Sequence, residues 1–167
     1  MSNIKKTILG LDPGFADTGF GVVTKENHTL KFITAGSIKT DKKLDFAKRL
    51  EVIYKEINLL IKKYQPDIVA IEKLYFARNV TTALDVGQAR GVVLLAIAQQ
   101  QKNFIEFTPL QVKLTLTGSG AADKRQVGLM VKTILKLSAV PKPDDAADAV
   151  ALAICGAWFN QKLSQVK

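Results

Sequence analysis

The residues of this chain best suited to chemistry are four acids in separate parts of the sequence: Asp12, Glu72, Asp145 and Asp148. Asp12 and Glu72 each follow a short apolar run. Asp145 and Asp148 are three residues apart in a predicted helix, a spacing that puts both on one face. Each acid also has an ordinary explanation. Asp12 precedes Pro-Gly and suits a turn, Glu72 suits an exposed strand end, and acids in a first helical turn complement the helix dipole by about 0.3–1 kcal/mol.

Three acids within five residues, Asp144, Asp145 and Asp148, exceed what a helix start requires. A divalent cation would offset their repulsion. Mg²⁺ prefers oxygen ligands and binds through a few carboxylates, waters and substrate phosphates. Two such ions about 3.5–4 Å apart can activate a water and stabilise the leaving oxygen in phosphodiester hydrolysis. The sequence therefore predicts two Mg²⁺ ions on Asp12, Glu72, Asp145 and Asp148, with Mn²⁺ able to substitute.

Scarce residue types exclude several other mechanisms. Cys155 is the only cysteine, so neither an intrachain disulfide nor a multi-cysteine zinc site can form. His28 is the only histidine, and it lies in a polar segment that suits a hairpin tip. Mechanisms that pair serine or cysteine with histidine would all have to use this one residue. Catalysis in this chain must therefore use carboxylates, lysines, hydroxyls or a metal held by oxygen.

The chain carries a basic surplus. Its 167 residues include 24 Lys+Arg and 15 Asp+Glu, which gives a net charge of +9. Without the four candidate acids the balance is 24 basic against 11 acidic residues, or +13. Such a surplus can serve solubility alone, but clustered Lys and Arg also bind phosphate groups. The charge therefore favours a polyanionic partner such as DNA.

Hydrophobic periodicity predicts the elements that must position the acids. Strands are expected over residues 7–11, 19–24, 29–38, 68–71 and 103–107, and helices over residues 41–64, 81–101, 109–116, 127–135 and from 144 onward. The first three strands would form an antiparallel unit, and the later strands alternate with helices. This order predicts an α/β domain with a mixed sheet and helices on both faces. Asp12 and Glu72 both fall at carboxyl ends of strands, where sites form in such sheets.

Five short motifs, in this order along the chain, carry a resemblance to a known family. They are ILGLDPG at 8–14, AIE at 70–72, GQARG at 87–91, QVK at 111–113 and DAADA at 145–149. A strand followed by Asp-Pro-Gly is also similar to the phosphate loop of actin-like ATPases and sugar kinases, but those need a longer, two-lobed chain. Together the five motifs resemble the RuvC family of bacterial Holliday junction resolvases, over essentially the whole chain.

The resemblance implies an RNase H-like fold, with a mixed five-stranded sheet flanked by helices in one nuclease domain over 1–160 and a short tail over 161–167. It implies a homodimeric crossover junction endodeoxyribonuclease that nicks two strands of like polarity in a four-way DNA junction, during recombination and repair. Partnership with RuvA and RuvB is also implied. The family's four catalytic acids fall on Asp12, Glu72, Asp145 and Asp148. Asp144 lies outside that pattern, and we predict it to be the helix N-cap.

The resemblance also extends to basic residues. Lys113 and Lys124 match positions that help the family bind the scissile region, and an ammonium there would offset charge that develops in the transition state. Arg125 follows Lys124 and joins the predicted DNA contacts. From the residues alone, an ordinary surface lysine is the preferred interpretation of both Lys113 and Lys124. Asp123 stands where the family usually has glutamate, which is a small change.

The segment after Glu72 places two adjacent aromatic residues, Tyr75 and Phe76, between Lys73 and Arg78. We predict a wedge, in which one ring stacks on a base at the junction centre while the cations hold phosphates. Tyr75 occupies the family's aromatic position. The alternative is that a ring packs into the core or a dimer contact, which we expect for one of the two.

A stripe of small residues, Ala83, Gly87 and Gly91, runs along the helix predicted over 81–101 and permits close approach of another backbone. The resemblance places this helix at or near the dimer interface. Packing of the helix on its own sheet is the alternative.

Two further functions stay open at this level. One is another RNase H-like nuclease acting on RNA–DNA hybrids; the other is a junction-binding module without catalysis, which the presence of all four acids disfavours. No apolar run approaches the roughly 20 residues of a membrane span, and the N-terminal residues lack the apolar region of a signal peptide. We therefore expect a cytoplasmic protein that does not enter a membrane.

Overall fold

A computed structural model describes residues 5–74 and 80–159 of the chain. Its strands are β1 (Lys5–Asp12), β2 (Asp17–Glu26), β3 (Thr29–Lys39), β4 (Ile68–Glu72) and β5 (Phe104–Phe107). Its helices are α1 (Phe46–Tyr64), α2 (Val80–Gln99), α3 (Pro109–Thr117), α4 (Lys124–Ile134) and α5 (Asp144–Trp158).

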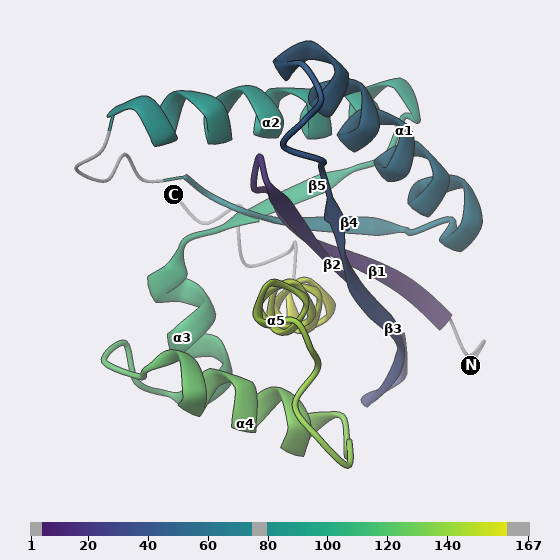
Figure 1. The fold of residues 1–167 in the computed structure, drawn as a ribbon. Coiled ribbons are helices and arrows are strands. Elements are labelled where there is room, and N and C mark those ends of the chain that lie inside the picture. Colours follow the sequence, from purple (N-terminus) through teal and green to yellow (C-terminus); the bar gives the residue numbers. More distant parts are fainter. Residues whose placement is uncertain (1–4, 75–79, 160–167) are drawn as a thin grey trace, which may run out of the picture.

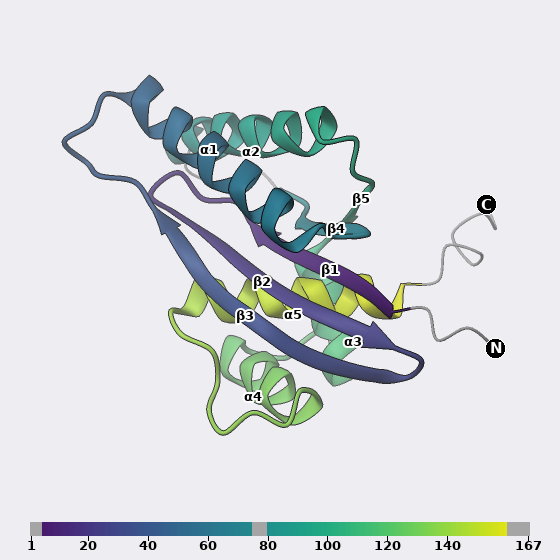
Figure 2. The ribbon, with the colours of Figure 1, turned by 90° about the vertical axis from the view of Figure 1, so that its right-hand side faces the viewer.

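The strands form one mixed sheet in the order β3-β2-β1-β4-β5. β1 pairs antiparallel with β2, and β2 with β3, whereas β4 lies parallel to both β1 and β5. Figures 1 and 2 show α1 and α2 on one face of this sheet, with α5 on the other face and α3 and α4 beyond it. The predicted α/β architecture with helices on both faces is confirmed.

The alternation of side chains along β1 builds a core on each face. Ile8 points to the face covered by α5, whereas Leu9 and Leu11 point to the face covered by α1 and α2. All three side chains are fully buried, because a central strand with helices on both sides exposes neither face to water.

Helix α5 lies unusually close to the sheet, because glycines in β1 and β2 leave room for its backbone. A Cβ atom on Gly10 would lie 1.9 Å from the carbonyl oxygen of Ala149. At Gly19 it would lie 2.1 Å from the carbonyl oxygen of Asp145. The first turns of α5 are thereby laid against the carboxyl end of β1 and the beginning of β2. This contact brings the acids of α5 to the sheet edge that carries Asp12.

One predicted helix start and one predicted N-cap are wrong. Helix α1 begins at Phe46, not at residue 41, because Asp41 forms a turn in which its carboxylate accepts a hydrogen bond from the backbone N–H of Lys43 at 2.9 Å. Asp144 is the first residue within α5, and the N-cap is Pro143, which makes no side-chain cap. The Asp144 carboxylate instead lies 3.2 Å from the ammonium of Lys142.

The other elements lie within a few residues of their predicted bounds. No helix among residues 5–74 and 80–159 is long and apolar enough to cross a bilayer. The domain limit predicted at residue 160 stays a prediction, since residues 160–167 lie outside the described part of the chain.

Candidate active site

The sheet brings two of the four predicted acids together at its carboxyl edge. β1 and β4 are parallel neighbours, with Leu11 paired to Ile71, so Asp12 and Glu72 are the next residues on adjacent strands. Their carboxyl groups interact directly, by charge and by a hydrogen bond. The structure thus brings Asp12 and Glu72 together at one sheet edge, as the sequence predicted.

Helix α5 adds the other two acids. Carboxylate oxygens of Asp12, Asp145 and Asp148 all lie within 4.8 Å of one another. The three side chains are half-buried, so each keeps a path to solvent while losing part of its hydration. Such a group of hard oxygen ligands fits a divalent cation of the Mg²⁺ class.

The acids of this cluster are partly buried and repel one another, so the cluster favours binding of a positive charge. Burial, followed by the charges of Glu72, Asp148 and Asp145, raises the pKa of Asp12 to about 8. Burial and the Asp148 charge also raise the pKa of Glu72. The pKa of Asp148 is raised because burial outweighs the favourable contact with Lys124. Without a cation, the protein therefore holds a proton among these acids at neutral pH.

Lys124 is the predicted lysine that the structure places among the acids. Its ammonium lies 2.8 Å from a carboxylate oxygen of Asp148. This hydrogen bond raises the pKa of Lys124, so the side chain stays charged. The position of Lys124 is set by the helix start. The Asp123 carboxylate accepts a hydrogen bond from the backbone N–H of Gln126 at 2.7 Å, and the Gln126 side-chain oxygen accepts one from the backbone N–H of Asp123 at 2.8 Å. This reciprocal cap makes Lys124 the first residue of α4.

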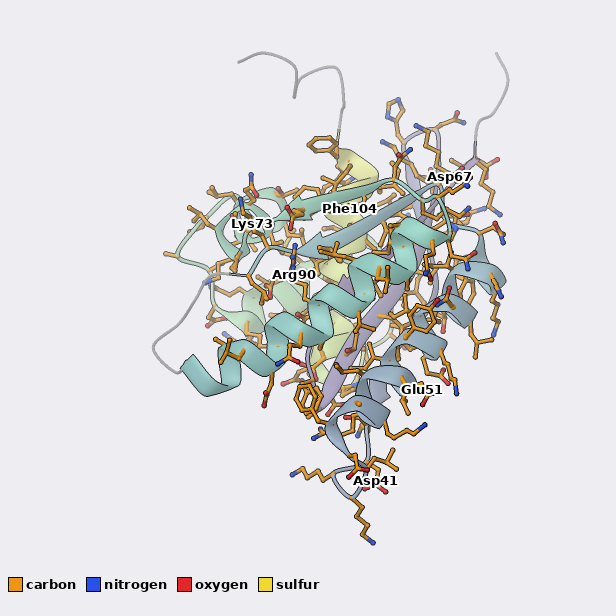
Figure 3. All side chains as sticks on the ribbon, turned by 90° about the horizontal axis from the view of Figure 1, so that it is seen from above. Asp41, Glu51, Asp67, Lys73, Arg90 and Phe104 are labelled. Atoms are coloured by element: carbon orange, nitrogen blue, oxygen red, sulfur yellow. The ribbon has the colours of Figure 1, made fainter. Side chains whose placement is uncertain are left out.

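The remaining basic predictions lie further from the cluster. Lys113 is half-buried on α3, and within the described residues no ion pair joins it to any of the four acids. Arg125 is exposed next to Lys124 on α4. Lys73 is exposed directly after Glu72, and its backbone N–H donates to the carbonyl of Phe107 at 2.8 Å (Figure 3). The aromatic loop prediction falls outside the described residues for three of its members: Tyr75, Phe76 and Arg78.

A support for the loop after Asp12 was not anticipated from the sequence. The carbonyl of Phe15 accepts a hydrogen bond from the Thr40 hydroxyl at 2.8 Å, and Arg49 Nε donates to that hydroxyl at 2.9 Å. The Phe15 ring stacks on Phe46 with centroids 4.4 Å apart. These partners lie on distant segments, so no local pattern could reveal them. The cap at Asp123, in contrast, has a readable signal, an acid followed three residues later by glutamine.

Helix α2 carries an ion pair to the outer strand. Arg90 projects from α2 toward the sheet and pairs with Glu106 of β5 (Figure 3). The pair fixes α2 to β5, the edge strand beside β4.

This fold and this cluster define a class. A mixed five-stranded sheet with acids at the ends of β1 and β4, completed by acids of a helix across the sheet, is the arrangement of an RNase H-like nuclease. The family model described as crossover junction endodeoxyribonuclease RuvC matches residues 8–156. The chain belongs to the RuvC family, as the motifs of its sequence indicated.

Individual relatives agree with this assignment. A crossover junction endodeoxyribonuclease RuvC from Thermosipho melanesiensis is 53% identical over 148 residues, which cover 89% of this chain and 94% of the relative. The structure of Thermus thermophilus RuvC is similar with a TM-score of 0.83 and 33% identity, over 90% of this chain and 93% of that one. T. thermophilus RuvC in complex with a Holliday junction substrate is equally similar, with a TM-score of 0.83, 31% identity and coverage of 90% and 92%. Membership of this family of nucleases implies dependence on a divalent metal, which the carboxylate cluster fits.

Proposed function

We propose that this chain resolves four-way DNA junctions, by Mg²⁺-dependent nicking of two strands of like polarity during recombination and repair. The observation that carries the proposal is the convergence of Asp12, Asp145 and Asp148 within 4.8 Å at the carboxyl edge of the sheet. A four-way junction as the substrate is supported by the similar T. thermophilus protein in complex with one. The net charge of +9 suits a nucleic acid partner.

Asp12, Glu72, Asp145 and Asp148 would hold two Mg²⁺ ions, and Mn²⁺ would substitute because the ligands are all carboxylate oxygens. When bound, the ions supply an activated water and charge stabilisation at the leaving oxygen. The protein's part is to hold four carboxylates in place while their hydration is reduced. The raised pKa of Asp12 means that this carboxyl gives up its proton when a cation arrives.

Lys124 has a separate part at the scissile phosphate. Its ammonium, held 2.8 Å from Asp148, stands beside the acids and would offset negative charge on the phosphate oxygens as the bond breaks. Lys113 on α3 and Arg125 on α4 would bind the phosphates on either side. In this proposal Lys113 reaches the DNA backbone, not the acids.

Lys73, Tyr75, Phe76 and Arg78 would open the junction centre. Lys73, the first residue of this segment, directly follows Glu72 at the end of β4. Stacking of Tyr75 on an unpaired base, with cations on the neighbouring phosphates, would favour a branched substrate over a linear duplex.

A homodimer is supported by one face of α2. Leu84 and Leu95 are 58% and 52% exposed on this face. Between them, no atom of another element within the described residues lies within 4 Å of where a Cβ on Gly87 or Gly91 would be, so these two positions are not packed on the described sheet. A second copy could bring its own helix against the stripe, and a two-fold dimer would present one site to each of two strands. RuvA and RuvB as partners, a cytoplasmic location and a domain limit at residue 160 remain predictions.

Incubation of the protein with a labelled synthetic four-way junction and Mg²⁺ tests the proposal. We expect paired nicks in strands of like polarity, and no cutting of a linear duplex or an RNA–DNA hybrid of the same sequence. Asp148→Asn should abolish nicking while junction binding persists. Equal cutting of the hybrid would favour the other RNase H-like nuclease, and binding without cutting at any divalent metal would favour the non-catalytic module.

A further inference from the structure

A cavity of about 310 Å³ lies directly beside the acid cluster, between α4 and the start of α5. Its lining residues belong to α4, to the segment between α4 and α5, and to the first turns of α5, and Figure 1 shows where these elements lie. Lys124 and Asp148, which pair at 2.8 Å, belong both to the cavity lining and to the active site. The cavity is therefore an extension of the site and not a separate hollow.

The lining combines cations with an apolar wall. Arg125 and Lys142 stand at the cavity with Lys124, while Leu129 and Val140 supply apolar surface. Leu129 is 44% exposed although it lies beside charged groups. Within the described residues Lys142 is paired with Asp144, whereas no ion pair engages Arg125. A site for phosphate alone needs cations but no apolar wall, so the lining suits a ligand with both phosphate and apolar faces.

We propose that this cavity receives the base and sugar of the nucleotide next to the scissile phosphate. The proposal rests on the proposed function, since it assumes that a DNA strand crosses the acids. Successive nucleotides of one strand are spaced by about 3.4 Å along a duplex axis. A strand whose phosphate lies at Asp148 and that runs on toward α4 places a neighbouring nucleotide at the mouth of this cavity, which begins at the same residue.

The volume and the chemistry agree with one nucleotide. Small-ligand sites range over about 300–1,000 Å³, and this cavity stands at the lower end, which is too small for a base pair. Leu129 and Val140 would pack on the base or sugar, while Arg125 would hold the next phosphate. The nucleotide would then fix the register of the scissile phosphate over the acids, so its loss should lower the rate of nicking more than the affinity for the junction.

Two junctions test the proposal, each with a single abasic residue on one side of the scissile phosphate. In the native protein, we expect the abasic residue at one of the two positions to lower the nicking rate about tenfold, with little change in Kd. Leu129→Ser should lower the rate on the intact junction by a similar factor. On the abasic junction, Leu129→Ser should cause no further loss, because base and side chain act through the same contact. Val140→Ala should repeat this pattern in a weaker form.

Leu114→Ser is the matched control, because Leu114 is 47% exposed on α3 and outside the cavity lining. It should leave nicking of all junctions unchanged. Thermal melts confirm that each variant is folded. The subsite is refuted if both abasic junctions are cut at the normal rate, or if the losses from Leu129→Ser and the abasic residue multiply. Failure of the native protein to cut any junction would instead refute the proposed function.

Discussion

The guanidinium carbon of Arg49 lies 3.9 Å from the centroid of the Phe15 ring, which follows Asp12 by three residues. The same guanidinium donates to Thr40, and Thr40 holds the carbonyl of Phe15. Helix α1 thus supports the loop that leaves the active site, although it contributes no acid to it. The support joins a cation–π contact to a chain of hydrogen bonds, each of the order of 1 kcal/mol.

Arg49→Ala should therefore disturb the position of Asp12. We expect a loss of about 1–3 kcal/mol in the free energy of unfolding and a fall in kcat without a matching rise in KM for the junction. Denaturant melts and steady-state nicking measure the two effects. Arg49→Lys should recover part of the charge contact but not the geometry. Lys48→Ala is the control, since Lys48 is exposed and pairs with Glu51 on the same helix. An equal loss of kcat there would contradict the role given to Arg49.

The stability of the metal-free protein should fall as pH rises from about 4 to about 8. The pKa of Asp12 is raised to about 8 in the folded state. Between the unfolded and folded pKa values the folded protein binds the extra proton, so stability is greatest below that range and declines through it. Melting temperatures in a chelator at several pH values measure the decline, and saturating Mg²⁺ should suppress it. A metal-free melting temperature that rises across this range would contradict the assignment.

Asp12→Asn should abolish nicking activity and raise the stability of the metal-free protein. The amide removes one negative charge from the cluster and can keep the turn before Pro13. At pH 8 without metal, the melting temperature should therefore rise, by about 2–4 °C for each kcal/mol of repulsion removed. Nicking should be abolished while the junction is still bound. Asp17→Asn is the control, because Asp17 lies outside the cluster and bonds to Ser37; a similar gain in stability there would show that the effect is not specific to the site.

The cap at Asp123 should matter for catalysis as well as for folding. Asp123→Ala removes the hydrogen bond to the N–H of Gln126, which should cost about 1 kcal/mol of stability and loosen the helix start that holds Lys124. Nicking should fall, because Lys124 then loses its fixed position beside Asp148. Asp123→Asn keeps a capping oxygen and should restore both properties. If Asp123→Ala destabilised the fold but left the specific activity of the folded fraction unchanged, Lys124 would not depend on this cap.

The exposed face of α2 predicts the oligomeric state. Leu84→Arg should convert a dimer into a monomer, because a long charged side chain would enter the stripe between two helices. Leu59→Arg is a close match, since Leu59 is also 58% exposed but lies on α1. Light scattering of both variants gives their masses, and the Leu84 variant should lose the paired nicks. An unchanged mass for Leu84→Arg would show that no dimer forms through this face of α2.

Much of the site follows from sequence alone. The apolar runs before Asp12 and Glu72 determine two buried strands, and the strand ends are where each side chain leaves the core. The spacing of Asp145 and Asp148 determines that both share one helical face. These features depend on local periodicity and on the burial of apolar residues, so they can be read without knowing the partners of any element.

Other features arise only when distant segments meet. Whether Asp12 and Asp148 lie within reach of one cation depends on the close approach of α5, which the space at Gly10 and Gly19 allows. The pairing of Lys124, but not of Lys113, with an acid depends on how α4 packs beside α5. Asp144 was predicted to be an N-cap from its type and place, yet the chain makes Pro143 the cap. A side chain's type limits what it can do, but its distance to a partner on another element is set by the packing of the whole domain.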